Sequence, residues 1–398
     1  MPKKIFAIST LVLMLTIAII FAYNYAFKKT DSSASSQTAA KSTAEGKTEN
    51  ASSASENTAP ANSVSAEATA SKQTISAVSD QPAFGAVLAP DNASIYYFSA
   101  DNGQLNQMDF NGKLEKVVST EGFKDIQKVA WNKSRNTAII KRADGKSGSK
   151  FLILDLAEKK VSALKNSVDS AAWSNLGDKI IYKYYDSKTG KRTVNVSDPD
   201  GGNWRKVADT SFVDLEIAAV PGLAAISFWP MPDAYTATSV DLVNFSGEND
   251  KEILKGRYGA DLLWSPDGKS AAVSYTDQKG GKKTDLAIMN SDGGQFHSLN
   301  FPTFTKKCAW SSDSKHLFCA MPGNISENST LPDDWQEGKF QTADTFWKIE
   351  VATGKKDRLV EVEKIDDSYD VLNPFLSADE KTLFFINKAD GKLYKLSF

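Results

Sequence analysis

Histidine and cysteine are scarce in this sequence of 398 residues, which contains two of each. Structural zinc sites take four Cys or His ligands, and iron–sulfur clusters are held by Cys thiolates. The ligand count therefore excludes most centres of these kinds, and we expect no metal site and no cofactor. His297 and His316 are the two candidate bases for a Ser–His–Asp triad, and we expect each to be an exposed or capping residue instead.

A large excess of charge of one sign is also missing. The 47 Lys and Arg residues are matched by 49 Asp and Glu residues, which gives a formal net charge of −2. Nucleic-acid binding needs a strongly basic domain or face, so no nucleic-acid partner is expected. The nucleophile motif G-x-S-x-G, the zinc-protease motif H-E-x-x-H and the P-loop are absent as well. No catalytic residue is therefore assigned from a motif.

Residues 1–30 contain a long apolar run, from Ile5 to Tyr23, which Lys3 and Lys4 precede. As a helix, these nineteen residues would be roughly 28 Å long, close to the ~30 Å hydrocarbon core of a bilayer. A cleaved signal peptide is the alternative. It should have a shorter apolar core followed by small residues, whereas an aromatic and basic segment follows here. We therefore predict one uncleaved transmembrane helix in residues 1–30.

Residues 31–72 consist almost entirely of Ser, Ala, Thr, Asn, Glu and Lys, without one aromatic residue. Such a segment buries too little apolar surface to offset its ordering entropy, so we predict a disordered linker. Basic residues flank both ends of the apolar run and favour a cytoplasmic N-terminus only slightly. A polar tether after an anchor is typical of exported domains. We expect a single-pass protein of the cytoplasmic membrane with its C-terminal domain on the extracytoplasmic side; a cytoplasmic linker is the alternative.

Residues 73–398 contain a repeated pattern. A short apolar strand ends in Trp, a turn rich in Ser, Pro, Asp, Gly or Asn follows, and a second apolar strand begins; the clearest copy runs from Leu262 to Val273. The Trp position, with Leu or Val in its place in three copies, falls at Leu88, Trp131, Trp173, Val220, Trp264, Trp310 and Leu376. Successive spacings are 42 to 47 residues, except for a last spacing of 66. Further short strands and turns after each copy predict an all-β fold, a seven-bladed β-propeller of four-stranded blades.

The two ends of this region complement each other. The seventh unit stops after its third strand, and a strand-like segment at residues 74–79 precedes the first unit. We predict that this segment supplies the missing fourth strand and closes the last blade, because closure removes an exposed sheet edge.

The residues W-S-P-D-G-K at positions 264–269 resemble the repeat of TolB-like propellers, which are related to the WD-repeat class. The resemblance covers residues 73–398, with one clean copy of the motif, three partial copies and three degenerate ones. It implies a propeller that often has a periplasmic or extracellular interaction role. It does not imply one activity, because function lies in the loops.

The two cysteines, Cys308 and Cys319, flank one predicted hairpin. Pairing Trp310 with Leu317 places Cys308 opposite Cys319 on neighbouring strands. Two interpretations stay open: a disulfide in an exported domain, or two small buried apolar residues. Stability rather than catalysis depends on the outcome.

Two predicted loops are unusual. One is the aromatic segment 228–235, and the other is an insertion at residues 321–344 that accounts for the long last spacing. Long aromatic loops on a rigid scaffold are common binding sites. We predict one contact surface made of Trp229, Met231, Tyr235, Asp333, Asp334 and Trp335. The alternative is that the insertion only packs on its own blade.

The repeats therefore favour a non-enzymatic, monomeric binding or scaffold module. It would present its loops to an envelope protein, a peptide or a glycan. Lysine-rich turns of the second, third and fifth units, on the same predicted face, are either solvated or favour an anionic partner. The alternative function is an extracellular, glycosidase-like hydrolase with two carboxylates in the central channel.

Overall fold

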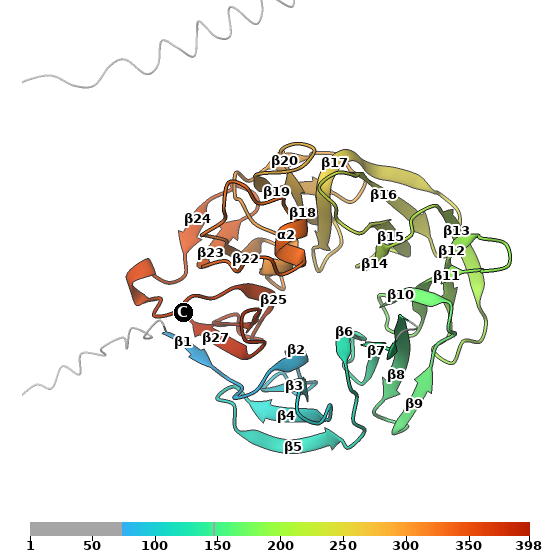
Figure 1. The fold of residues 1–398 in the computed structure, drawn as a ribbon, viewed down its shortest axis with the longest axis horizontal. Coiled ribbons are helices and arrows are strands. Elements are labelled where there is room, and N and C mark those ends of the chain that lie inside the picture. Colours follow the sequence, from blue (N-terminus) through green and yellow to red (C-terminus); the bar gives the residue numbers. More distant parts are fainter. Residues whose placement is uncertain (1–73, 146–147) are drawn as a thin grey trace, which may run out of the picture. The chain divides into compact units, whose positions relative to one another are not determined.

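The computed structural model describes residues 74–145 and 148–398. Antiparallel sheets are arranged radially in this part of the chain and form a ring (Figure 1). The predicted all-β propeller fold is therefore confirmed. The predicted transmembrane helix of residues 1–30 and the predicted linker of residues 31–72 lie outside the described residues. Within the two described ranges, no helix has the length and apolar character needed to span a membrane.

The described residues form five four-stranded sheets and one seven-stranded sheet. The first sheet contains β2 (Ala83–Leu88), β3 (Ser94–Ser99), β4 (Leu105–Asp109) and β5 (Leu114–Ser119). The second contains β6 (Ile126–Trp131), β7 (Thr137–Ala143), β8 (Ser149–Asp155) and β9 (Lys160–Ala163). The third contains β10 (Val168–Trp173), β11 (Ile180–Tyr185), β12 (Arg192–Ser197) and β13 (Arg205–Thr210).

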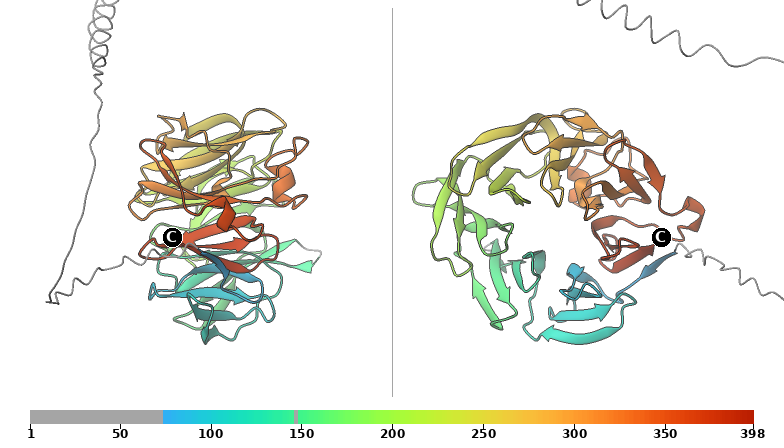
Figure 2. Two further views of the ribbon diagram at one scale, coloured as in Figure 1. Left: turned by 90° about the vertical axis from the view of Figure 1, so that its left-hand side faces the viewer. Right: turned by 180° about the vertical axis from the view of Figure 1, so that it is seen from behind.

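The seven-stranded sheet follows in the chain. It contains β14 (Leu215–Val220), β15 (Ala225–Pro230), β16 (Ala237–Asn244), β17 (Lys251–Trp264), β18 (Ser270–Thr276), β19 (Thr284–Asn290) and β20 (His297–Ser298). A 3-10 turn, η2 (Thr305–Lys307), leads to the sheet of β21 (Cys308–Trp310), β22 (His316–Met321), β23 (Thr345–Glu350) and β24 (Lys356–Arg358). The insertion between β22 and β23 carries a short helix, α2 (Asp333–Gln336), which projects from one face of the ring (Figure 2).

The last sheet joins the two ends of the described chain. After η3 (Val362–Lys364) it contains β25 (Val371–Leu376), β26 (Thr382–Asn387), β27 (Leu393–Ser397) and β1 (Thr74–Ala77). β1 pairs antiparallel with β27, with Thr74 opposite Ser397 and Ala77 opposite Tyr394. The predicted closing strand is thus confirmed, although it ends at Ala77 rather than at residue 79.

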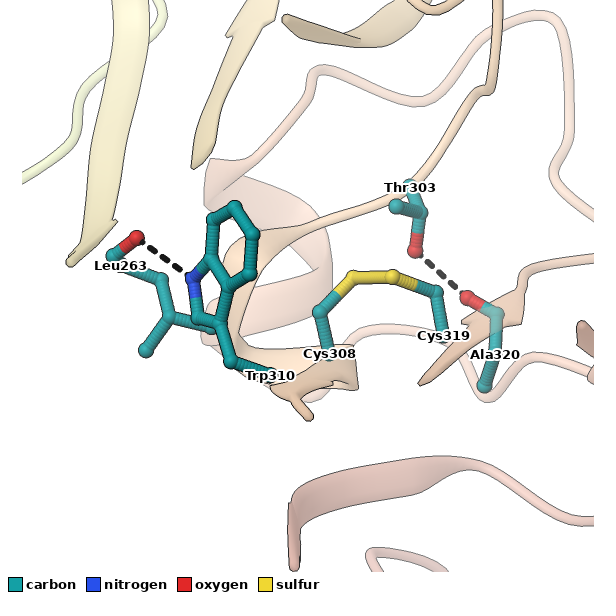
Figure 3. The surroundings of a disulfide bond; sticks show 6 residues. All are labelled: Leu263, Thr303, Cys308, Trp310, Cys319 and Ala320. Carbon is teal, nitrogen blue, oxygen red and sulfur yellow. Dashed lines mark hydrogen bonds between the residues drawn. A yellow bond between two sulfur atoms is a disulfide. The ribbon is translucent and has the colours of Figure 1, made fainter. Parts of the chain in front are cut away.

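The repeated Trp connects neighbouring repeat units. Its indole N–H donates to an acceptor on the preceding unit at 2.8 to 3.0 Å; the pairs are Trp131 with the Gly85 carbonyl, Trp173 with the Ala130 carbonyl, Trp264 with the Ser227 hydroxyl and Trp310 with the Leu263 carbonyl. Figure 3 shows the last of these. A buried Trp needs a partner for its N–H, and this geometry provides one while the ring packs between the sheets.

The turn after Trp264 is formed by Asp267 and Gly268. Asp267 Oδ1 accepts hydrogen bonds from the Ser265 hydroxyl at 2.7 Å and from the backbone N–H of Lys269 at 3.1 Å. Gly268 has a φ of +66°, and a Cβ at this position would lie 1.6 Å from the carbonyl oxygen of Pro221. Only glycine fits this close approach. The side chain of Asp267 therefore caps the backbone of its own turn.

Candidate functional site

A cavity of about 1050 Å³ lies at the inner side of the ring. It is lined mainly by the innermost strands β2, β6, β10, β14, β17 and β25, together with η2 and the start of β21. We call this cavity the channel. Each repeat unit contributes its innermost strand, so side chains that are far apart in the sequence face one common space.

One ionic group in the channel is centred on Glu216 of β14. Its carboxylate accepts from the ammonium of Lys128 at 2.8 Å, and the ammonium of Lys306 lies 3.8 Å away. Burial acts to raise the pKa of Glu216, but the two lysines outweigh burial and lower it. Burial likewise acts to lower the pKa of Lys128, and Glu216 outweighs it, so that the pKa is raised. Both groups are therefore charged near neutral pH.

Asp261 of β17 lies beside this group and is buried. Its Oδ1 accepts from the indole N–H of Trp229 and from the backbone N–H of Leu262, both at 3.1 Å, and its Oδ2 is 2.8 Å from the hydroxyl of Thr305. Burial raises the pKa of Asp261, and the ammonium of Lys306 only partly offsets this. Because both carboxyl oxygens already have partners within the protein, Asp261 positions β15 and η2 against β17.

A second ionic group joins Lys183 of β11 to Asp169 of β10, with 2.8 Å between ammonium and carboxylate. The Lys183 side chain is 1% exposed, and its ammonium also donates to the carbonyl of Val213. Burial raises the pKa of Asp169, although the Lys183 ammonium acts in the opposite direction. The sequence predicted that the lysines of the third unit, Lys183 among them, lie in a turn on one loop face. Lys183 is instead buried in β11, so this prediction is wrong for this residue.

The six residues of the predicted contact surface divide into buried and exposed ones. Trp229 and Trp335 are 3% and 2% exposed, so both are packing residues and neither is available to a partner at the surface. Met231 and Tyr235 are 41% and 56% exposed. The prediction that large aromatic side chains mark the contact surface is therefore wrong for the two tryptophans, whose indole N–H groups donate to the buried carboxylates of Asp261 and Asp370.

The structure does bring the two unusual loops together. Asp333 Oδ1 accepts from the backbone N–H of Ala234 at 3.0 Å, and the side-chain amide of Gln336 is 3.5 Å from the carbonyl of Pro232. Burial raises the pKa of Asp333. Asp334 instead stays within the insertion, where it accepts from the backbone N–H of Thr330 at 2.7 Å and from Lys339 at 2.8 Å.

Trp335 fixes the insertion to the ring through a buried polar cluster. Its ring stacks on Phe304 with centroids 4.5 Å apart, and the ammonium of Lys307 lies 4.9 Å from its centroid. That ammonium donates to Asp344 and Asp370 at 2.6 Å each, and all three side chains are fully buried. The insertion thus packs on the neighbouring sheet as well as on its own.

The carboxylates of this cluster have different environments. Burial raises the pKa of Asp344, whereas for Asp370 the contacts with Lys307 and Trp335 outweigh burial and lower the pKa. Sequence reasoning missed Lys307, Asp344 and Asp370. Each lies in an ordinary polar context, and they meet only through the tertiary fold, so no local pattern identifies them.

The two cysteines are bonded to each other. Cys308 of β21 lies opposite Cys319 of β22, and a disulfide joins them with 4.1 Å between their Cα atoms (Figure 3). Both are buried beside the hydrogen bond from the hydroxyl of Thr303 to the carbonyl of Ala320. The pairing inferred from Trp310 and Leu317 agrees with the register of these strands. Among the described residues no group of three or more His, Cys, Asp and Glu side chains is arranged to hold a metal ion.

No family model and no curated protein sequence matches the chain. Solved structures do match it. An oligogalacturonate lyase from Vibrio parahaemolyticus aligns with 10% identity over 83% of this chain and 94% of that one, with a TM-score of 0.58. The β-propeller domain of Myceliophteria thermophila Cps50 (Swd1) aligns with 9% identity over 81% and 99%, with a TM-score of 0.54. TolB from Acinetobacter baumannii aligns with 13% identity over 79% and 63%, with a TM-score of 0.44. The likenesses above a TM-score of 0.5 show that this chain has the fold of a β-propeller.

Proposed function

We propose that the protein is a membrane-anchored binding or scaffold module whose propeller lies on the extracytoplasmic side of the cytoplasmic membrane. Its partner is an envelope protein, peptide or glycan, and it is bound by a loop surface made of residues 231–236, 277–283 and 321–344. The observation that carries the proposal is that these three segments, from separate parts of the chain, are joined into one frame on which Met231 and Tyr235 stay exposed.

The frame is built from backbone hydrogen bonds. Gly280 donates to the carbonyl of Ala234 at 2.7 Å, and Leu331 donates to the carbonyl of Gly281 at 2.9 Å. Asp333 closes the circuit by accepting from Ala234. Loops held in this way lose little conformational entropy when a partner binds, and exposed Tyr side chains are frequent binding hot spots.

The extracytoplasmic location is supported by two independent features. The disulfide between Cys308 and Cys319 belongs to an oxidising compartment, because cytosolic proteins keep their thiols reduced. The apolar run in residues 1–30 has the length of a membrane span, and the polar segment 31–72 has the composition of a tether.

We also infer that the ring has seven blades. In the seven-stranded sheet, β17 pairs with β16 through its first part and with β18 through its second part, and Tyr258 has a partner on each side. One long strand thus serves as the outer strand of one blade and the inner strand of the next. Dividing the sheet within β17 gives two four-stranded blades, which join the five other four-stranded sheets.

The binding proposal is tested by photo-cross-linking of the full-length protein in intact cells. A photoreactive amino acid at position 235 should give a discrete cross-linked product, and Met231→Ala should weaken it. The matched control carries the same amino acid at position 114, because Leu114 is 53% exposed on the outer strand β5. Equal products from both positions, or none from position 235, would contradict the loop surface. Loss of the propeller to protease added outside the cells tests the location separately.

A hydrolase acting through channel carboxylates is the second candidate. It is favoured by the presence of Glu216 and Asp261 in one cavity, with pKa values shifted in opposite directions. Against it, Asp261 has three partners within the protein and Glu216 is paired with lysine. Release of nitrophenol from aryl glycosides by the full-length protein, abolished in Glu216→Gln, would establish this activity in place of simple binding.

A further inference from the structure

We propose that the channel is a binding site for small organic anions, held by the ammonium groups of Lys128, Lys141 and Lys306. The three lysines lie outside the segments of the loop surface, although Met231 of that surface also lines the cavity. All three lysines line the same cavity: Lys128 and Lys141 come from the sheet of β6 to β9, and Lys306 comes from η2.

Two of these lysines are neighbours across the β6–β7 pair. Lys128 lies directly opposite Lys141 in the strand register. Like charges in such positions repel each other and destabilise a sheet unless an anion lies between them. Lys128 is partly compensated by Glu216, whereas the ammonium of Lys141 lies 5.7 Å from the centre of the Phe151 ring and forms no ion pair with a carboxylate among the described residues.

The third ammonium lies nearest to the other oxygen of the same carboxylate, Oε1, whereas Lys128 pairs with Oε2. Lys306 lies 3.8 Å from Glu216, beyond hydrogen-bonding distance, and its side chain is 34% exposed. Lys141 is also close enough to Glu216 to lower the pKa of this carboxyl group further. One carboxylate is therefore shared by three ammonium groups, which leaves hydrogen-bond donors and positive charge facing the cavity.

The other acidic groups of the channel have partners of their own or lie apart from the three lysines. Asp169 is paired with the buried Lys183, and Asp261 is held by Trp229, Leu262 and Thr305. Asp214 is an exposed carboxylate beside Asp169, on the side of the Lys183 pair. Among the described residues, Glu216 is thus the carboxylate that forms ion pairs with these lysines, and Asp261 acts on Lys128 and Lys306 only from a longer distance.

The dimensions of the channel restrict the ligand to a small molecule. Its volume of about 1050 Å³ is at the upper end of the range for small-molecule sites, and strands enclose it around the ring. Within the cavity, the ammonium groups of Lys128, Lys141 and Lys306 make a local basic region, and such a region attracts anions from solution. Ammonium groups bind carboxylates and phosphates alike, so organic anion is the class that this chemistry defines.

The test is a titration of the full-length protein in detergent, followed by calorimetry. The probes are citrate, trigalacturonate and glucose 6-phosphate, with maltotriose as the neutral counterpart of the sugar acid. We expect at least one anion to bind and maltotriose not to bind, with binding weakened by added salt. Binding of citrate alone would identify a small acid as the preferred anion. Binding of trigalacturonate would identify a uronate, and binding of glucose 6-phosphate would identify a phosphate ester.

The variants distinguish a built site from unspecific binding. Lys141→Gln and Lys306→Gln should each weaken binding about tenfold, because each removes one charged donor. Glu216→Gln should strengthen it about tenfold, since it removes the competing carboxylate, and a merely structural role of Glu216 would not produce this gain. Lys160→Gln on the outer strand β9 is the matched control and should bind as the unmodified protein does. Absence of anion binding at 20 mM, about the limit of calorimetry for weak ligands, or equal effects of Lys141→Gln and Lys160→Gln, would overturn the proposal.

Discussion

The indole N–H of Trp335 donates to Oδ1 of Asp370 at 2.9 Å, which joins the insertion to the segment that leads into β25. The same oxygen accepts from the ammonium of Lys307 at 2.6 Å and from the hydroxyl of Thr342 at 2.9 Å. One carboxylate oxygen thus connects three segments of the chain. The loop surface depends on this connection, because the helix that carries Trp335 also carries Asp333, the partner of Ala234.

Replacement of Trp335 by Phe should destabilise the protein. The ring stacking on Phe304 is largely kept, but the buried Asp370 loses one of its donors, at a cost of about 1–3 kcal/mol. Urea unfolding of the full-length protein in detergent measures this change. Trp204→Phe is the control because Trp204 is 58% exposed, and it should change the unfolding free energy by less than about 0.5 kcal/mol. Equal effects of both variants would mean that the indole donor contributes nothing.

Lys307→Met should have a larger effect. It leaves Asp344 and Asp370 buried without their counter-ion, and removal of one partner from a buried ion pair costs about 3–5 kcal/mol. Additional Asp344→Asn and Asp370→Asn replacements should recover part of this loss, because the uncompensated charges are then gone. The measurement is the unfolding free energy of the single and triple variants. A triple variant less stable than Lys307→Met would contradict the view that uncompensated buried charge causes the loss.

The sequence predicted the parts of the fold that depend on local and repeated patterns. The Trp spacing located the innermost strands, and the strand pairing placed Cys308 opposite Cys319. The segment before the first repeat had the pattern of a strand and became β1. Each of these features needs only strand periodicity, turn chemistry and the expectation that the last blade is completed by a strand from the other end of the ring.

The contents of the site depend on contacts between distant segments, and the sequence did not predict them. Lys307 and Asp370 are 63 residues apart, and no periodicity relates them. Trp229 was assigned to an exposed loop because it stands in an aromatic segment, but it occupies the end of β15, where Asp261 accepts its N–H. Only the exposed fractions of the side chains separated Met231 and Tyr235 from the buried tryptophans.

The disulfide should be complete in protein taken directly from cells and should stabilise it. Replacement of both Cys308 and Cys319 by Ser should lower the unfolding free energy by about 2–4 kcal/mol, because the bond restricts the unfolded chain. The measurement is urea unfolding with and without reductant. Labelling with a thiol reagent after unfolding provides the control: thiols that react without reductant would contradict the extracytoplasmic location.

The hydroxyl of Tyr394 should report on the last sheet at high pH. Burial and the hydrogen bond of 2.8 Å to Asp390 raise its pKa to about 12. Because the folded state favours the neutral phenol, this contribution to stability is fully present below about pH 10 and is lost as the pH rises towards 12. Tyrosinate absorbance of the full-length protein, compared with Tyr394→Phe, should show the late titration. Asp390→Asn should move it to lower pH, and an unchanged curve would contradict the assigned cause.

Closure of the ring by β1 should be needed for the stability of its last sheet. Ile75 is 8% exposed and packs in the cluster that contains Phe385 and Leu396, so Ile75→Ala should cost about 2 kcal/mol or more. Ser76 is exposed on the same strand, and Ser76→Ala is the matched control. If β1 detaches, β27 loses its backbone partners on β1, such as Ile75 opposite Leu396. The N–H groups along the outer edge of β27 are then unpaired and accessible to solvent. Hydrogen exchange of the full-length protein should then accelerate in β27 more than in β3. Uniform acceleration in both strands would mean that the ring unfolds as one unit without a separate opening of this edge.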